Sequence, residues 1–161
     1  MNKAYLLIGG NVGNRPLNLQ QAVKAIDERC GRVIRQSSVY ETAAWGKTDQ
    51  QAFLNQALAI ETALPAENLL QAVLDVETSL GRIREERYGP RVIDIDIIFF
   101  NDAVIDLPQL TVPHPEVQNR RFALVPLAEI APGFLHPLLH QTICELLTDC
   151  PDELPVKLFG I

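Results

Sequence analysis

The hydrophobic and polar positions of the chain follow two different periods, and their order predicts six elements. Segments that are apolar, β-branched or alternating predict strands over residues 4–8, 33–42, 52–62 and 91–100. Apolar residues at helical spacing predict two helices. Pro16 opens the first and Gly31 ends it, while Pro65 opens the second and Gly81 ends it. The glycine- and asparagine-rich segment 9–14 is expected to be the turn between the first strand and the first helix.

The order strand, helix, strand, strand, helix, strand is the ferredoxin-like βαββαβ arrangement. It predicts an α+β fold in which both helices pack on one face of an antiparallel sheet. C-terminal additions follow: a short return strand near 104–105, an extended segment at 110–113, helices near 121–130 and 141–149, and a tail over 151–161. With 161 residues, we expect a single domain spanning 1–161.

The strand at 91–100 carries two carboxylates in an otherwise apolar sequence. Side chains alternate along a strand, so Asp94 and Asp96 share one face, roughly 6.6 Å apart. The other face takes Ile93, Ile95 and Ile97. Buried carboxylates need a cation, and Mg²⁺ is commonly held by one or two carboxylates together with substrate phosphates. The alternative is a solvated face at a sheet edge, but Ile98 and Phe100, expected on the same face as the aspartates, argue against it.

A run of arginines precedes this strand. The members are Arg82, Arg84, Arg87 and Arg91. Guanidinium groups suit phosphate oxygens, so a loop of this kind can close over a triphosphate. Glu85 and Glu86 partly neutralise the loop, and a solvated charged turn is the competing interpretation.

Two further clusters suit an anion and a flat ligand. His114 lies between two prolines with Arg120 close behind, an arrangement suited to anion binding, although a plain surface loop explains the segment equally well. Phe53 and Asn55 share a strand face, where an aromatic ring and an amide can hold a flat heterocycle. Ordinary core packing is the alternative. Further rings are available from Trp45, Tyr88 and Phe122.

Charge and composition argue against nucleic acids and membranes as binding partners. A net charge of −6 argues against broad nucleic-acid binding. There is no apolar run long enough to span a membrane, and the first apolar run is too short for a signal peptide. The odd number of cysteines, 3, lacks metal-type spacing and fits a reduced, cytoplasmic protein.

Several motifs in order resemble one enzyme family. The run Arg87-Tyr-Gly-Pro-Arg-Val-Ile-Asp-Ile-Asp-Ile-Ile98 resembles the signature of the 6-hydroxymethyl-7,8-dihydropterin pyrophosphokinase family of folate biosynthesis. The run from Pro113 to Phe122 resembles its second hallmark. Shorter matches occur in order at Ile8-Gly-Gly-Asn11, Tyr40-Glu-Thr42, Phe53-Leu-Asn55, and Glu77 with Gly81-Arg82-Ile-Arg84. The likeness covers about residues 4–132. The chain departs from the common pattern at Gly10, Ala43-Ala44, Tyr88 and Pro115.

The resemblance implies transfer of a pyrophosphoryl group from ATP to the hydroxymethyl oxygen of the pterin, with release of AMP. It implies two Mg²⁺ ions on Asp94 and Asp96, and catalytic roles for these aspartates together with Arg82 and Arg91. The implied ATP-binding residues are Glu77, Arg84, Ile97, Thr111, His114 and Arg120. The implied pterin-binding residues are Thr42, Ala43, Trp45, Phe53, Asn55 and Phe122. We expect a cytoplasmic monomer that binds small molecules and neither nucleic acid nor membrane.

Two other interpretations share the same topology. A palm-type nucleotidyl transferase or cyclase also uses strand carboxylates, but usually draws them from two strands. A non-enzymatic ligand-binding module would not need paired aspartates that face an arginine loop.

Overall fold

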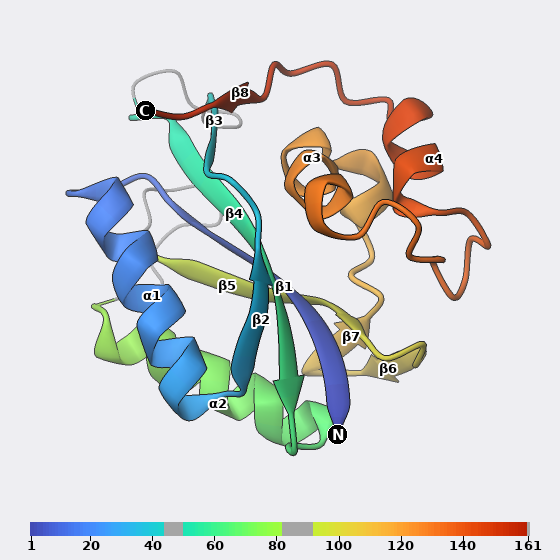
Figure 1. The fold of residues 1–161 in the computed structure, drawn as a ribbon, viewed down its shortest axis with the longest axis horizontal. Helices are drawn as coiled ribbons and strands as arrows, with labels where there is room; N and C mark the ends of the chain where they lie inside the picture. The colour runs from blue at the N-terminus through green and yellow to red at the C-terminus, as the bar shows by residue number, and fades with distance from the viewer. Residues whose placement is uncertain (44–49, 82–91, 161) are drawn as a thin grey trace.

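The computed structural model describes residues 1–43, 50–81 and 92–160 (Figure 1). Within these ranges the strands are β1 (Asn2–Gly10), β2 (Arg32–Gln36), β3 (Tyr40–Thr42), β4 (Phe53–Thr62), β5 (Asp94–Phe100), β6 (Ile105–Leu107), β7 (Leu110–Val112) and β8 (Lys157–Leu158). The helices are α1 (Arg15–Arg29), α2 (Ala66–Ser79), α3 (Arg121–Ile130) and α4 (Ile143–Thr148), with a 3-10 turn, η1, at Val117–Asn119. This confirms the α+β class.

The main sheet is antiparallel and runs in the order β5-β1-β4-β3-β8, with β2 also paired to β4. Strands β6 and β7 form a separate two-stranded sheet. The central pair, β1 and β4, runs in register from Asn2 opposite Thr62 to Gly10 opposite Leu54. The long central strands therefore provide a fixed frame on which residues far apart in sequence are brought side by side.

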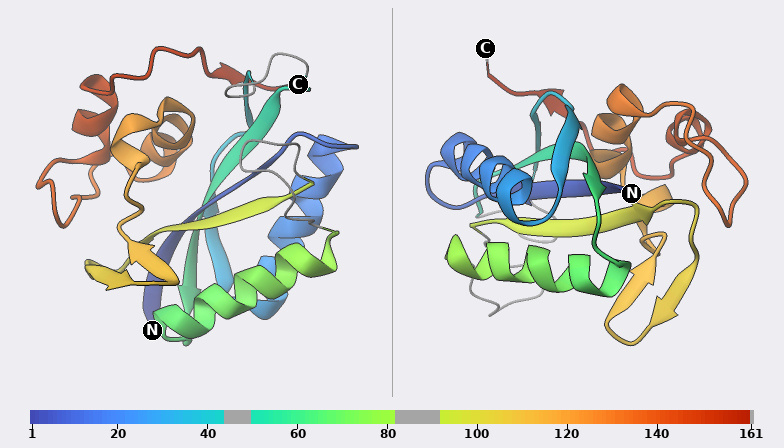
Figure 2. Two further views of the ribbon diagram at one scale, coloured as in Figure 1. Left: turned by 180° about the vertical axis from the view of Figure 1, so that it is seen from behind. Right: turned by 60° about the horizontal axis from the view of Figure 1, so that its bottom comes forward.

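Each face of the sheet carries its own hydrophobic core. Helices α1 and α2 cover one face, where Leu6, Leu58 and Ile95 pack with helix residues such as Ile26 and Val73. Helices α3 and α4 cover part of the other face, where the core residues are Tyr5, Leu7, Ala57, Ala59, Ile98, Phe99, Leu124, Leu127 and Ile143, with others. Figure 2 shows α1 and α2 on one side of the sheet and α3 and α4 on the other. By side-chain alternation, Asn55, Asp94 and Asp96 lie on this second face.

The predicted strand at 33–42 is in fact two strands, β2 and β3. Gln36 lies opposite Leu58 and Tyr40 opposite Asn55, so the connecting segment is one residue longer than the part of β4 that it faces. Ser37 fills the irregularity: its N–H donates to the carbonyl of Ala57 at 2.9 Å, and its hydroxyl accepts from the Ala57 N–H at 2.9 Å. A side chain thus satisfies a backbone group that the ladder would otherwise pair.

The expectation that Phe100 shares the face of the aspartates is wrong. The register between β1 and β5 shifts near Tyr5 and Leu6, where Tyr5 pairs with Phe99 and Leu6 with Ile97. Ile98 is the extra residue, and one extra residue moves everything after it to the opposite face. Phe100 therefore packs in the core beneath α1 and α2.

Three smaller expectations also change. The expected turn begins later, because Gly9 and Gly10 belong to β1. The tail contains a strand, β8, that pairs with β3. The return strand near 104–105 forms a hairpin, β6 with β7. No helix in the described ranges is long and apolar enough to cross a membrane.

Candidate active site

The two aspartates of β5 lie on the α3 side of the sheet, near several of the other predicted site residues. Asp94 is opposite Gly9 of β1, and Gly9 is opposite Asn55 of β4. Asn55 is in turn opposite Tyr40 of β3. Directly opposed residues of antiparallel strands are about 5 Å apart. One glycine therefore separates the strand of the proposed metal ligands from the strand of the proposed pterin ligand.

Gly9 is required because the side chain of Asn55 lies over it. A Cβ at Gly9 would press against the Asn55 amide and would lie 2.8 Å from the Leu54 carbonyl oxygen. Asn55 is buried. The amide is thus fixed over β1, in the direction of the aspartates, by close packing against a backbone without a side chain.

Thr42 and Phe53 form the next pair along β3 and β4. Thr42 is buried, and among the described residues its hydroxyl oxygen has no hydrogen-bond partner. A buried hydroxyl without a partner is costly, and a polar ligand atom would satisfy it. Phe53 is half-buried, and Ala43, the next residue after Thr42, is exposed.

His114 is held close to β5 by its backbone. Its N–H donates to the Ile98 carbonyl at 3.0 Å, and its Nδ1 accepts from the Glu116 N–H at 3.1 Å. Burial and then the charge of Arg120 lower the pKa of His114 to about 4, while Glu116 and Asp94 act in the opposite direction. The imidazole is therefore neutral at pH 7. Because Nδ1 accepts a hydrogen bond, the proton is on Nε2, where it can be donated to a phosphate oxygen.

Arg120 and Phe122 stand at the start of α3. The Arg120 guanidinium carbon is 5.8 Å from the centre of the Phe122 ring, within the range of a cation–π contact. The first turn of α3 therefore presents a cation, close to His114, and a half-buried ring on the same side of the sheet as the aspartates.

Three of the predicted ATP-binding residues have side chains that lie apart from those on the α3 side of the sheet. Glu77 is buried on α2, and its Oε2 accepts from the Ile95 N–H at 2.6 Å. The Ile97 side chain packs in the core beneath α1 and α2, so only its backbone can face a ligand on the α3 side. Thr111 is exposed on β7.

Asp94 and Asp96 have donor chemistry that fits Mg²⁺. Both are half-buried carboxylates on one strand face. Across residues 1–43, 50–81 and 92–160, no cluster of three or more His, Cys, Asp or Glu side chains is placed to hold a metal. Two carboxylates alone suit a magnesium ion that takes its remaining ligands from water and phosphate.

Comparison with known proteins identifies the family. The family described as 7,8-dihydro-6-hydroxymethylpterin-pyrophosphokinase (HPPK) matches residues 5–132. The chain belongs to this family.

Relatives and solved structures agree. A 2-amino-4-hydroxy-6-hydroxymethyldihydropteridine pyrophosphokinase from Methylorubrum extorquens is 47% identical over 136 residues, which are 84% of this chain and 86% of the relative. The protein of the same name from Bacillus subtilis is 45% identical over 130 residues, 80% of this chain and 78% of the relative. A crystal structure of Plasmodium falciparum HPPK-DHPS matches with a TM-score of 0.73 at 19% identity, over 92% of this chain and 43% of that one. The chain thus spans most of these two relatives but less than half of the crystallised protein.

Membership in the HPPK family removes the support for a palm-type transferase and for a ligand-binding module. Several predicted residues, Trp45, Arg82, Arg84 and Arg91, lie outside the described residues, as do Arg87 and Tyr88. Eight of the predicted residues lie within the described ranges and on the α3 side of the sheet. They are Thr42, Phe53, Asn55, Asp94, Asp96, His114, Arg120 and Phe122. Sequence reasoning missed Gly9 as the residue beneath Asn55. The signal was available, because a glycine within a strand often marks a close approach.

Proposed function

We propose that the chain transfers the pyrophosphoryl group of ATP to the hydroxymethyl oxygen of 6-hydroxymethyl-7,8-dihydropterin in folate biosynthesis. The proposal depends chiefly on one observation: an Asp pair and a buried amide lie on one sheet face, separated by a single glycine. The family assignment gives the chemistry for this arrangement. We further propose a ferredoxin-like core, a single-domain cytoplasmic monomer and two Mg²⁺ ions.

The acceptor side is formed by β3, β4 and the start of α3. Asn55 reads the edge of the pterin with its amide, which both donates and accepts hydrogen bonds. Phe53 and Phe122 offer ring faces for stacking, and the Thr42 hydroxyl offers a further polar contact. Ala43 and Trp45, which follow Thr42, are assigned to this side by the family resemblance.

The phosphate side is formed by β5 and by the segment that leads into α3. Neutral His114 donates from Nε2 and Arg120 supplies positive charge, so both suit the triphosphate. Glu77, Arg84, Ile97 and Thr111 are assigned to the ATP site by the family resemblance, with Ile97 contributing through its backbone. Metal ions on Asp94 and Asp96 would neutralise phosphate charge and lower the pKa of the acceptor hydroxyl.

Transfer is then a displacement at the β-phosphorus. The pterin hydroxymethyl oxygen forms a bond to that phosphorus and loses its proton to water. The bond between the β-phosphorus and the oxygen that it shares with the α-phosphorus breaks, and AMP leaves with that oxygen. The chain contributes chiefly by placing the acceptor oxygen and the phosphorus together. We assign Arg82 to the developing charge and Arg91 to phosphate and substrate binding, by family resemblance.

The test is to incubate the protein with ATP, Mg²⁺ and 6-hydroxymethyl-7,8-dihydropterin and to identify the products. We expect AMP and the pterin pyrophosphate in equal amounts. Formation of ADP, or of free pyrophosphate without a pterin product, would contradict the proposal. Omission of the pterin and addition of EDTA are the two controls, and each should abolish AMP formation.

A further inference from the structure

Arg15, at the start of α1, joins the two strands of the acceptor side from the opposite face of the sheet. Its Nη1 lies 2.7 Å from Glu41 Oε2 on β3 and 2.8 Å from the carbonyl oxygen of Ala52, directly before β4. The Arg15 side chain is 13% exposed. Nη1 can make both contacts at once because this one nitrogen carries two N–H donors in the plane of the guanidinium.

The neighbouring Asn11 strengthens the same connection. Its Nδ2 donates to Gln50 Oε1 at 3.0 Å and to the Gln51 carbonyl at 2.9 Å. Asn11 is itself buried. The turn between β1 and α1 therefore holds the backbone that enters β4.

Because side chains alternate along a strand, the contacts of Arg15 also bear on the proposed pterin ligands Thr42 and Phe53. Glu41 is opposite Leu54, which packs beneath α1 and α2. Thr42 and Phe53, the next pair, must face the α3 side. Fixing Glu41 and Ala52 therefore fixes the two residues that come directly after them in the chain.

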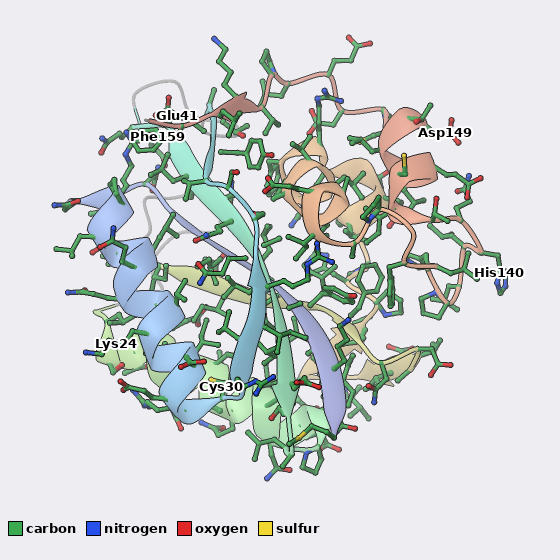
Figure 3. The ribbon with its side chains drawn as sticks, in the orientation of Figure 1. Lys24, Cys30, Glu41, His140, Asp149 and Phe159 are labelled. Atoms are coloured by element: carbon green, nitrogen blue, oxygen red, sulfur yellow. The ribbon has the colours of Figure 1, made fainter. Side chains whose placement is uncertain are left out.

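The C-terminal segment covers Arg15. In β8, Lys157 is opposite Glu41 and Leu158 is opposite Tyr40, and the N–H of Phe159 donates to the Val39 carbonyl at 2.9 Å. The Arg15 guanidinium carbon is 5.3 Å from the centre of the Phe159 ring. Figure 3 shows Phe159 and Glu41 next to each other at this end of the sheet. A ring over the guanidinium excludes water and strengthens the ion pair with Glu41.

We propose that Arg15 and Phe159 are positioning residues for the acceptor substrate, and that the C-terminal strand β8 serves the pterin side of the site by covering the Arg15–Glu41 pair. The inference builds on the proposed function. Neither residue touches the substrate, because both lie on the α1 side of the sheet. Loss of either should weaken pterin binding and leave ATP binding intact.

Two variants test the proposal, Arg15→Ala and Phe159→Ala. Pterin binding is measured by calorimetry in the presence of a non-hydrolysable ATP analogue and Mg²⁺, and the analogue is titrated separately. For Arg15→Ala we expect the Kd for the pterin to rise about tenfold, equivalent to roughly 1.4 kcal/mol, and the Kd for the analogue to change less than about twofold. Phe159→Ala should act in the same direction with a smaller rise.

The chain offers matched controls. Arg32 pairs with Glu61 at 3.5 Å on the same sheet, but both side chains are exposed, so Arg32→Ala should leave pterin binding unchanged. Leu158 precedes Phe159 and is 64% exposed, so Leu158→Ala tests whether any change in β8 has the effect. Arg15→Lys keeps the positive charge without the planar guanidinium that lies over Phe159, and should restore part of the lost affinity.

The outcomes separate this inference from the proposed function. Wild-type protein that makes no AMP refutes the proposed function itself. If the wild-type protein is active but the Arg15→Ala and Phe159→Ala variants bind pterin as tightly as the controls, the positioning role is refuted. An equal loss of pterin and ATP-analogue affinity also refutes it, because a general structural defect would then explain the result. If Arg15→Ala does not fold, the surface-proximal Phe159→Ala variant decides.

Discussion

At the scale of single residues, the site depends on which side chains are absent as much as on those present. Gly9 leaves room for the Asn55 amide to cross β1, and it lies directly opposite Asp94. The cost of placing two aspartates on one strand face is like-charge repulsion, which bound cations relieve. Each feature depends on one or two side chains and can be tested by a single substitution.

Gly9→Ala should displace Asn55. The new methyl group would meet the Asn55 side chain and the Leu54 carbonyl, so we expect a loss of about 1–3 kcal/mol in the free energy of unfolding and much weaker pterin binding. Denaturant unfolding and calorimetry measure the two effects. Gly133→Ala is the control, because a Cβ at Gly133 would meet nothing within 4 Å. Unchanged pterin affinity in Gly9→Ala would show that the placement of Asn55 does not matter.

Asp96→Ala should abolish turnover while the fold survives. Asp96 is a proposed metal ligand, and loss of such a ligand removes several kcal/mol of transition-state stabilisation, so we expect kcat to fall by at least about a thousandfold. In EDTA the melting temperature should stay the same or rise, since one member of a like-charged pair is gone. Asp102→Ala, in the exposed turn after β5, is the control and should keep full activity. A metal-free Asp96→Ala protein that unfolds would show that this carboxylate has a structural role as well.

At the scale of elements, β3 is held from both sides. Glu129 of α3 accepts from the Ser38 N–H at 3.1 and 3.0 Å and from the Tyr40 hydroxyl at 2.6 Å. On the other side of the sheet, Glu41 is held by Arg15. The strand that leads to Thr42 is therefore tied both to the helix that begins beside Phe122 and to the turn that begins α1.

The Glu129–Tyr40 contact predicts a pH dependence. Burial and then the bond to Glu129 raise the pKa of Tyr40 from 10.0 to about 12. A raised folded-state pKa stabilises the fold below pH 10, and this stabilisation is lost as pH rises from 10 to about 12. Glu129→Gln should lower the pKa of Tyr40 and reduce that loss. Ultraviolet titration of tyrosinate measures this change in the pKa of Tyr40, and Tyr40→Phe identifies which signal belongs to Tyr40. Glu153→Gln, on the exposed tail, is the control. An unshifted titration in Glu129→Gln would contradict the assignment.

At the scale of the whole molecule, one sheet supports two cores, and the proposed site lies beyond the end of one of them. The core beneath α1 and α2 fixes the backs of β1, β4 and β5. Helices α3 and α4 cover the other face where Tyr5, Leu7, Ala57 and Ala59 lie. Gly9, Asn55 and Asp94 follow further along the same strands, beyond these core residues.

This arrangement predicts that ligands stabilise the molecule in a metal-dependent way. A ligand present at 100 times its Kd adds about 2.7 kcal/mol to the free energy of unfolding. We expect Mg²⁺ with a non-hydrolysable ATP analogue to raise the melting temperature by several degrees, and EDTA to reverse the rise. Asp96→Asn should show no rise with Mg²⁺ and the analogue. A rise of the same size in EDTA would argue against a metal-bridged triphosphate.

The α+β class and the face that carries Asp94 and Asp96 could be predicted from the sequence alone, because strand period is a local property. The sequence also indicated Phe53 and Asn55 as neighbours on one face. It did not show that Phe100 turns to the other face, that β3 is separate from β2, or that the tail returns to pair with Glu41. Each of these features depends on a partner strand. The first is a bulge, the second is a side chain that replaces a hydrogen bond of the ladder, and the third is a contact between residues more than a hundred positions apart. Only the tertiary structure placed Gly9 between Asn55 and Asp94, because strand pairing fixes which distant residues meet.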